Sequence, residues 1–138
     1  MKAVYNQFEI ISKFCDVVTG VWKDDKLNHN HYKIIVKNTK LNKKASFDFY
    51  GSHNDWQNNK IELTEYDLLN AFHNIVSEAH EGYFYDFSEF CGSLGYDEDS
   101  REAERIYKAC GKEYDKLSKI GLTDEDDYIN IINDEKIQ

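Results

Sequence analysis

Hydrophobic residues in the second half of the chain recur every three or four positions, the spacing that lines one face of a helix. Thr64 is a capping residue for the first predicted helix, and its buried face is Leu68, Leu69, Phe72, Ile75, Val76 and Ala79. A second, shorter helix is predicted to begin at Asp86, because Glu89 follows three residues later as in a capping box. Gly95 is placed to end this helix in a left-handed conformation.

Asp99 and Glu102 repeat this start signal ahead of the longest predicted helix. Its apolar stripe is Ala103, Ile106, Tyr107, Cys110, Tyr114, Leu117 and Ile120. Gly121 is expected to stop the helix. On the opposite face, Glu104 precedes Lys108 by four residues, a pair worth about 0.2–0.5 kcal/mol when exposed, so this face is expected to be solvated.

The first half shows a different pattern, in which apolar and polar residues alternate. This alternation covers residues 31–37 and again residues 45–50, as in half-buried strands. The polar connector 38–44 between them predicts an antiparallel hairpin. The next stretch, residues 51–59, is rich in glycine, asparagine and aspartate and predicts a surface loop.

The segment from Val4 to Val18 has two interpretations that its pattern does not separate. It fits a helix through Val4, Phe8, Ile11, Cys15 and Val18, or a strand through Phe8, Ile10 and Phe14. The predicted fold is therefore α+β: a small antiparallel sheet of two or three strands packed against three C-terminal helices. We expect one domain over residues 1–122. An acidic tail follows over residues 123–138, with an apolar patch at 128–132 that can dock.

Length and composition fit one folded domain with little attraction to nucleic acid. The chain has 138 residues, of which 41% are hydrophobic and 14% aromatic, enough to build a core. Its 17 basic and 26 acidic residues give a net charge of −9. Because binding to nucleic acid depends mainly on neutralising phosphates, we expect no direct nucleic-acid partner.

The sequence also favours a cytoplasmic location. No apolar run approaches the roughly 20 residues that cross a bilayer, and the first residues lack the apolar centre of a signal peptide, so no membrane partner is expected. The three cysteines, Cys15, Cys91 and Cys110, are odd in number and widely spaced, unlike a disulfide framework or a zinc site. Reduced thiols are predicted.

Histidines and acids occur in patterns that fall short of a metal site. His29 and His31 precede a predicted strand, with no further ligands at a known spacing. His73 and His80 share a helix face, where a surface or half-buried pair is the expected state. Residues 97–101 alternate acids as a calcium loop does, but an arginine stands in the place of an oxygen ligand. No metal is predicted.

Catalytic signals are equally weak. Cys91 and Cys110 lie on predicted apolar helix faces, where burial raises the pKa of a thiol and makes it a poorer nucleophile. No glycine-rich stretch precedes a Lys-Ser or Lys-Thr pair, as a phosphate-binding loop requires. We therefore predict no enzyme, no catalytic residue and no cofactor.

One stretch carries a resemblance. Gly95-Tyr96-Asp97-Glu98-Asp99-Ser100-Arg101-Glu102-Ala103 resembles the Gly-Tyr-Asp-x-Asp-Ser-Arg-x-Ala signature of small acidic proteins encoded by phages and prophages. Similar upstream features are Asn30-His31-Tyr32, Phe49-Tyr50-Gly51-Ser52 and Tyr66-Asp67-Leu68-Leu69, so the likeness covers about residues 30–120. The signature reads as a helix-helix corner and implies no enzymatic activity. In size and charge the chain is similar to anti-CRISPR proteins, which bind and block host machinery.

Acidic clustering gives the functional hypothesis. Asp97, Glu98, Glu102 and Glu104 gather at one helix start, and Asp124, Asp126 and Asp127 lie beyond the other end of that helix. Such a surface can attract the basic nucleic-acid groove of a host defence nuclease or CRISPR effector, although acids also favour solubility and helix starts. Asp55 and Trp56 form a second candidate contact.

The resulting hypothesis is a phage inhibitor, a monomer or homodimer, that competes with nucleic acid on a defence nuclease. The alternative is a phage protein that binds a small ligand, as a sponge or sensor for a signalling nucleotide. The low basic content argues against this alternative, because anionic ligands usually need Arg or Lys.

Overall fold

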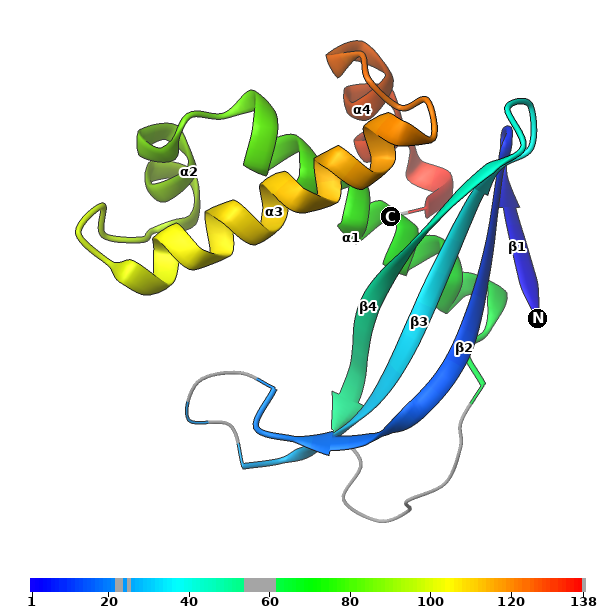
Figure 1. The fold of residues 1–138 in the computed structure, drawn as a ribbon, viewed down its shortest axis with the longest axis horizontal. Coiled ribbons are helices and arrows are strands. Elements are labelled where there is room, and N and C mark those ends of the chain that lie inside the picture. The colour runs from blue at the N-terminus through cyan, green and yellow to red at the C-terminus, as the bar shows by residue number, and fades with distance from the viewer. Residues whose placement is uncertain (22–23, 25, 54–61, 138) are drawn as a thin grey trace. The chain divides into compact units, whose positions relative to one another are not determined.

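The computed structural model of the chain describes residues 1–21, 24, 26–53 and 62–137 (Figure 1). In chain order its elements are β1 (Lys2–Tyr5), β2 (Phe8–Thr19), β3 (Asn28–Asn38), β4 (Lys43–His53), α1 (Glu65–Phe84), α2 (Phe87–Leu94), α3 (Arg101–Lys119), α4 (Glu125–Ile132) and the short 3-10 helix η1 (Glu135–Ile137). The fold is α+β, as predicted. The chain divides into two compact units, Met1–Ala71 and Phe72–Gln138, with the boundary inside α1.

The first unit contains a four-stranded antiparallel sheet of order β1-β2-β3-β4, so the expectation of two or three strands is wrong. The additional strands come from the segment Val4 to Val18, whose pattern fitted either a helix or a strand. It forms parts of β1 and β2 and contains no helix. The two strands turn at Asn6, whose φ of 50° lies in the left-handed region that asparagine tolerates. Burial alternates along them, with Tyr5, Phe8 and Ile10 inside.

The predicted hairpin is confirmed as β3 and β4, with strands longer than the pattern indicated. The Asn38 side chain is buried and accepts hydrogen bonds from the backbone N–H groups of Lys40 and Leu41, at 3.1 and 3.4 Å. These bonds close a tight turn, and Asn42 completes it at a φ of 52°. Because β4 continues to His53, the predicted loop is wrong over residues 51–53.

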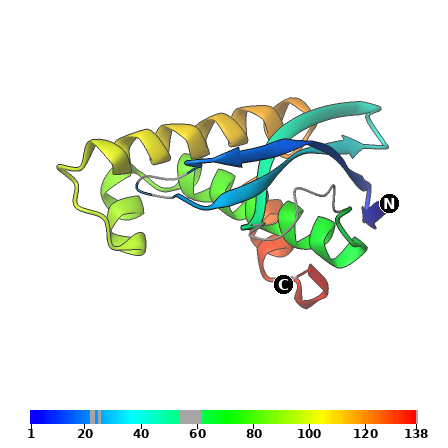
Figure 2. The same ribbon diagram turned by 90° about the horizontal axis from the view of Figure 1, so that it is seen from below.

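Bulges bend the three long strands, whose curvature Figure 2 shows. The register shifts between Phe14 and Asp16 on β2, and between His29 and His31 on β3. An extra residue in one strand increases local twist and turns the neighbouring side chains. One sheet face is buried, through residues such as Ile34, while the other is polar and partly exposed.

The second unit depends on a close contact between α1 and α3. A Cβ atom placed on Gly82 would lie 2.4 Å from the backbone carbon of Cys110 and 2.4 Å from the backbone nitrogen of Gly111. Real Cβ atoms do not approach backbone so closely. The absence of a side chain at position 82 is therefore what allows the two helix backbones to touch.

The corner between α2 and α3 is largely as predicted. Asp86 and Glu89 form a reciprocal capping box, and Gly95 ends α2 with a φ of 75°. One detail is wrong: the cap of α3 is Ser100 and not Asp99. The Ser100 hydroxyl accepts a hydrogen bond from the backbone N–H of Ala103 at 3.2 Å, a cap geometry that serine satisfies as well as aspartate.

The predicted acidic tail contains a fourth helix, α4, so the expectation of three C-terminal helices is also wrong. Two α1 histidines hold its ends. His80 Nε2 donates to the Glu125 carboxylate at 3.0 Å, and His73 Nε2 donates to the Ile132 carbonyl at 2.9 Å. The two contacts are seven residues apart on α1 and seven residues apart on α4, in opposite chain order. This is the spacing expected of two antiparallel helices with the same rise per residue.

Replacing Gly82 with alanine tests the close helix contact. We expect G82A to lower the free energy of unfolding by about 3 kcal/mol, at the upper end of overpacking costs, because backbone cannot move aside as a side chain can. G111A is the matched control. Its Cβ would lie 3.4 Å from the Gly82 carbonyl oxygen, and alanine favours helix, so its stability should stay within about 1 kcal/mol of wild type. The free energy of unfolding is measured by urea denaturation. Equal losses of this free energy in G82A and G111A would contradict the account.

Candidate protein-binding surface

Negative charge is concentrated in the second unit. Residues 1–71 carry ten lysines against nine acids, a net charge of +1, while residues 72–138 carry seven basic against 17 acidic residues, a net charge of −10. The excess of the whole chain therefore comes from the helical unit. A field of one sign on half of a small protein steers association with an oppositely charged partner.

The first acidic group lies on the corner between α2 and α3. Asp97 and Glu98 are exposed there. Glu102 and Glu104 lie one turn further along, on α3, where each already has a cationic neighbour. Arg105 lies 3.4 Å from Glu102, and the Lys108 ammonium lies 3.0 Å from Glu104. The structure thus divides the four predicted residues into two exposed corner acids and two ion-paired acids.

The second acidic group lies at the start of α4. Asp124, Asp126 and Asp127 are exposed, and Glu125 between them turns to His80. Asp124 precedes the helix without a capping hydrogen bond from its side chain. The two groups stand near opposite ends of α3 (Figure 1). A helix of 19 residues is about 28 Å long.

The second predicted contact, at Asp55 and Trp56, lies outside the described residues. It stays a prediction.

Sequence reasoning missed a polar cluster on the sheet. His31 Nε2 lies 2.9 Å from Asp48, and His31 Nδ1 lies 3.4 Å from Asp16, while its ring stacks on Tyr50. Lys33 donates to Asp48 at 2.7 Å, and this bond lowers the pKa of the Asp48 carboxyl. The cluster joins β2, β3 and β4 beside both bulges. Only the strand register brings these residues together, so no spacing in the sequence could reveal it.

The buried cysteines are poor nucleophiles, as predicted. Cys110 lies on α3 beside Gly82, and burial, together with the smaller effect of nearby glutamate charges, raises the pKa of its thiol to about 12. Burial also raises the pKa of the Cys91 thiol. Cys15 is exposed. A thiolate is the reactive form, so neither buried thiol is activated.

A buried glutamate was also missed. Glu113 of α3 has one carboxylate oxygen, Oε2, that is buried without a hydrogen-bond partner among the described residues. Burial, and then the negative charge of Glu78 on α1, raise the pKa of Glu113 to about 9. Burial also raises the pKa of Glu81. Glu113 adds no negative charge to the acidic surface near neutral pH, because its carboxyl stays protonated there.

Among residues 1–21, 24, 26–53 and 62–137, no group of three or more His, Cys, Asp or Glu side chains could hold a metal ion. No helix of the described chain is both long and apolar enough to cross a membrane. No protein-family model, curated protein or solved structure matches the chain.

Alkylation kinetics test the assignment of the thiols. With iodoacetamide at neutral pH, we expect the native protein to be labelled at Cys15 alone, and the unfolded protein to be labelled at all three cysteines. Mass spectrometry of digested protein reads each site. Native labelling of Cys110 as fast as Cys15 would show that its thiol is neither buried nor suppressed.

The pH dependence of stability tests the buried carboxyl. The folded-state pKa of Glu113 is raised from 4.5 to about 9, so between these values the folded chain holds a proton that the unfolded chain has released. Its stabilising contribution is complete below about pH 4.5 and is lost as the pH rises through about 9. We expect the melting temperature of E113Q to fall less than that of wild type between pH 6 and pH 9. Parallel curves for the two proteins would rule out this titration.

Proposed function

We propose that the protein is a phage-encoded inhibitor of a host defence nuclease, of the anti-CRISPR kind, and that it binds through the acidic surface of residues 72–138. The observation that carries the proposal is the net charge of −10 on this unit, with exposed acids at both ends of α3. The resemblance of residues 95–103 to a signature of phage proteins supports the choice of a host defence system as target.

The mechanism is competition for a nucleic-acid groove. Such grooves are lined with Arg and Lys, which attract a dense negative surface and speed its association. Each strand of a B-form duplex carries one phosphate per 3.4 Å of helix axis, so the roughly 28 Å length of α3 corresponds to about eight base pairs. An inhibitor of this span can occupy a substantial part of a groove that guide or target strands would fill.

The ion pairs rank the acids within this surface. Glu102 and Glu104 share their charge with Arg105 and Lys108, whereas the corner and α4 acids present theirs to solvent. The exposed pair Asp97 and Glu98, together with the start of α4, therefore makes the main contribution to binding in this mechanism.

Two matched charge-neutral variants test this ranking. We expect D97N/E98Q/D124N/D126N/D127N to lose inhibition about tenfold or more, because each amide keeps the shape of the acid and removes its charge. E102Q/E104Q should lose about threefold or less. The measurement is DNA cleavage by purified CRISPR effectors of several types, with and without the inhibitor. Thermal unfolding of each variant controls for folding.

Equal inhibition by wild type and the five-residue variant would contradict the acidic-surface mechanism. The variant W56A tests a contact through the predicted loop. If W56A loses inhibition while the acid variants keep it, the loop makes the contact and the acids do not. Affinity capture from a bacterial host, followed by mass spectrometry, identifies the target. Recovery of a nuclease complex supports inhibition, and recovery of phage structural proteins alone indicates a role in assembly.

A further inference from the structure

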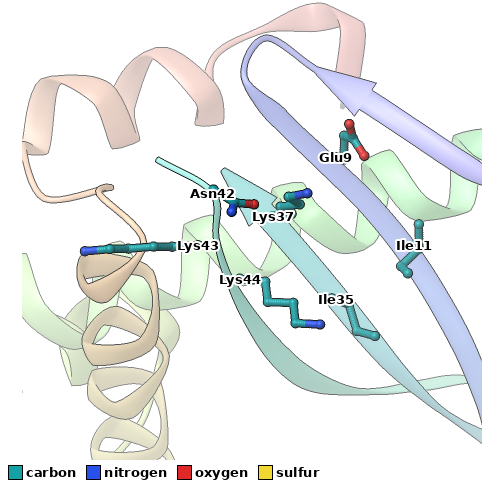
Figure 3. A pocket seen from close by; sticks show the side chains of 7 residues that line it. All are labelled: Glu9, Ile11, Ile35, Lys37, Asn42, Lys43 and Lys44. Carbon is teal, nitrogen blue, oxygen red and sulfur yellow. The ribbon is translucent and has the colours of Figure 1, made fainter. Parts of the chain in front are cut away.

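The exposed face of the sheet is hollowed near the β3–β4 turn (Figure 3). The cavity has a volume of about 420 Å³ and is lined by residues of β2, β3, the turn and the start of β4. Sites for small molecules usually have volumes of about 300–1,000 Å³. The hollow lies wholly within the first unit and shares no residue with the acidic surface proposed above.

Two isoleucines form an apolar floor. Ile11 of β2 and Ile35 of β3 are direct partners in the strand register. They lie on the sheet face opposite the core, and Ile11 is 40% exposed. Side-by-side isoleucines on a solvent-facing sheet surface offer a flat apolar patch that a planar ring can cover. Covering it favours binding, because apolar area is removed from water.

Lysines surround one end of this floor. Lys37 and Lys44 face each other directly across β3 and β4, an arrangement of like charges that destabilises a sheet. In Figure 3 the Lys44 side chain extends toward Ile35, whereas Lys43 extends away from the floor. Among the described residues, none of these three ammonium groups has a carboxylate within ion-pair distance. An anion between Lys37 and Lys44 would relieve their repulsion.

Glu9 also lines the hollow, on the β2 side of Lys37. It is the register partner of Lys37 on β2, but its carboxylate lies 3.7 Å from the ammonium group of Lys2 on the edge strand. Glu9 can accept a hydrogen bond from a hydroxyl or amino group of a ligand. Lys44, Lys37 and Glu9 therefore form one row across the sheet, and the isoleucine floor lies beside this row on the same face.

The basic rim is held in place before any ligand binds. Asn38 fixes the turn through its bonds to the backbone, as described above. Thr39 adds two bonds to the Gln7 carbonyl in the β1–β2 turn, from its backbone N–H at 2.8 Å and from its hydroxyl at 3.0 Å. Asn42, also in the lining, sits at the end of this fixed turn. A preorganised rim lowers the entropy lost on binding.

We propose that this hollow binds a small phosphorylated molecule with a planar ring, of the size of a nucleoside monophosphate. The phosphate contacts Lys37 and Lys44, the ring covers Ile11 and Ile35, and a hydroxyl or amino group donates to Glu9. The low basic content of the whole chain argued against a protein that binds a small anionic ligand. Residues 1–71, however, carry ten of the 17 basic residues, and the hollow lies among them. The proposal does not depend on nuclease inhibition.

Chemical-shift titration of the full-length, ¹⁵N-labelled protein tests the site with adenosine monophosphate, adenosine and inorganic phosphate as separate probes. We expect the nucleotide to shift amide signals of residues 35–37 and 42–44. Its affinity should exceed that of adenosine and of phosphate by about tenfold each, since each fragment makes only half of the contacts. Added salt should weaken nucleotide binding, because the contacts with the lysines are electrostatic.

Matched lysine variants decide whether the hollow is responsible. K37A/K44A should bind the nucleotide about tenfold more weakly or worse, while K13A, on the same sheet but outside the lining, should bind as wild type does. Equal weakening by K13A would overturn the site. Phosphate binding as tightly as the nucleotide would overturn the role of the isoleucine floor. A single-stranded oligonucleotide is a further probe. If it binds far more tightly than the nucleotide and shifts signals across the whole sheet, the site binds a nucleic-acid strand and the small-molecule proposal is wrong.

Discussion

The contact of α1 and α3 at Gly82 is the constraint on which the helical unit depends. Because the two backbones touch there, the side chains beside the contact are buried, including Cys110 on α3. The same packing encloses one oxygen of Glu113 and raises the pKa of its carboxyl. Groups that would be reactive or charged on an exposed helix are thereby made inert near neutral pH.

This packing separates two populations of acids. Glu113 is withdrawn from the surface, and Glu125 is used to hold α4 against His80. Among the acids that stay exposed are those at the α2–α3 corner and at the start of α4, where the amino-terminal ends of helices favour negative charge. The negative surface is therefore a consequence of how this unit folds, and the functional proposal assigns a partner to it.

The sequence predicts local structure well and long-range structure poorly. Capping and three-four spacing found three helices and the Gly95 stop, because these signals lie within a few residues of one another. Ser100 and Asp99 are both good caps, so spacing alone could not choose between them. The α4 helix was missed because its eight residues begin with a run of acids and depend on His73 and His80 from another helix.

The two candidate sites also differ in whether they depend on local or on long-range structure. The exposed acids could be found from the sequence because they cluster along the chain, whereas the lysine hollow arises from strand register, which places Ile11 beside Ile35. The central claim is that the acidic surface occupies a nucleic-acid groove. The most direct measurement is competition on the proposed nuclease target, with the labelled protein displaced by the nucleic acid that the target binds. We predict mutually exclusive binding that weakens steeply as salt rises. Simultaneous binding of inhibitor and nucleic acid to one complex would contradict the account.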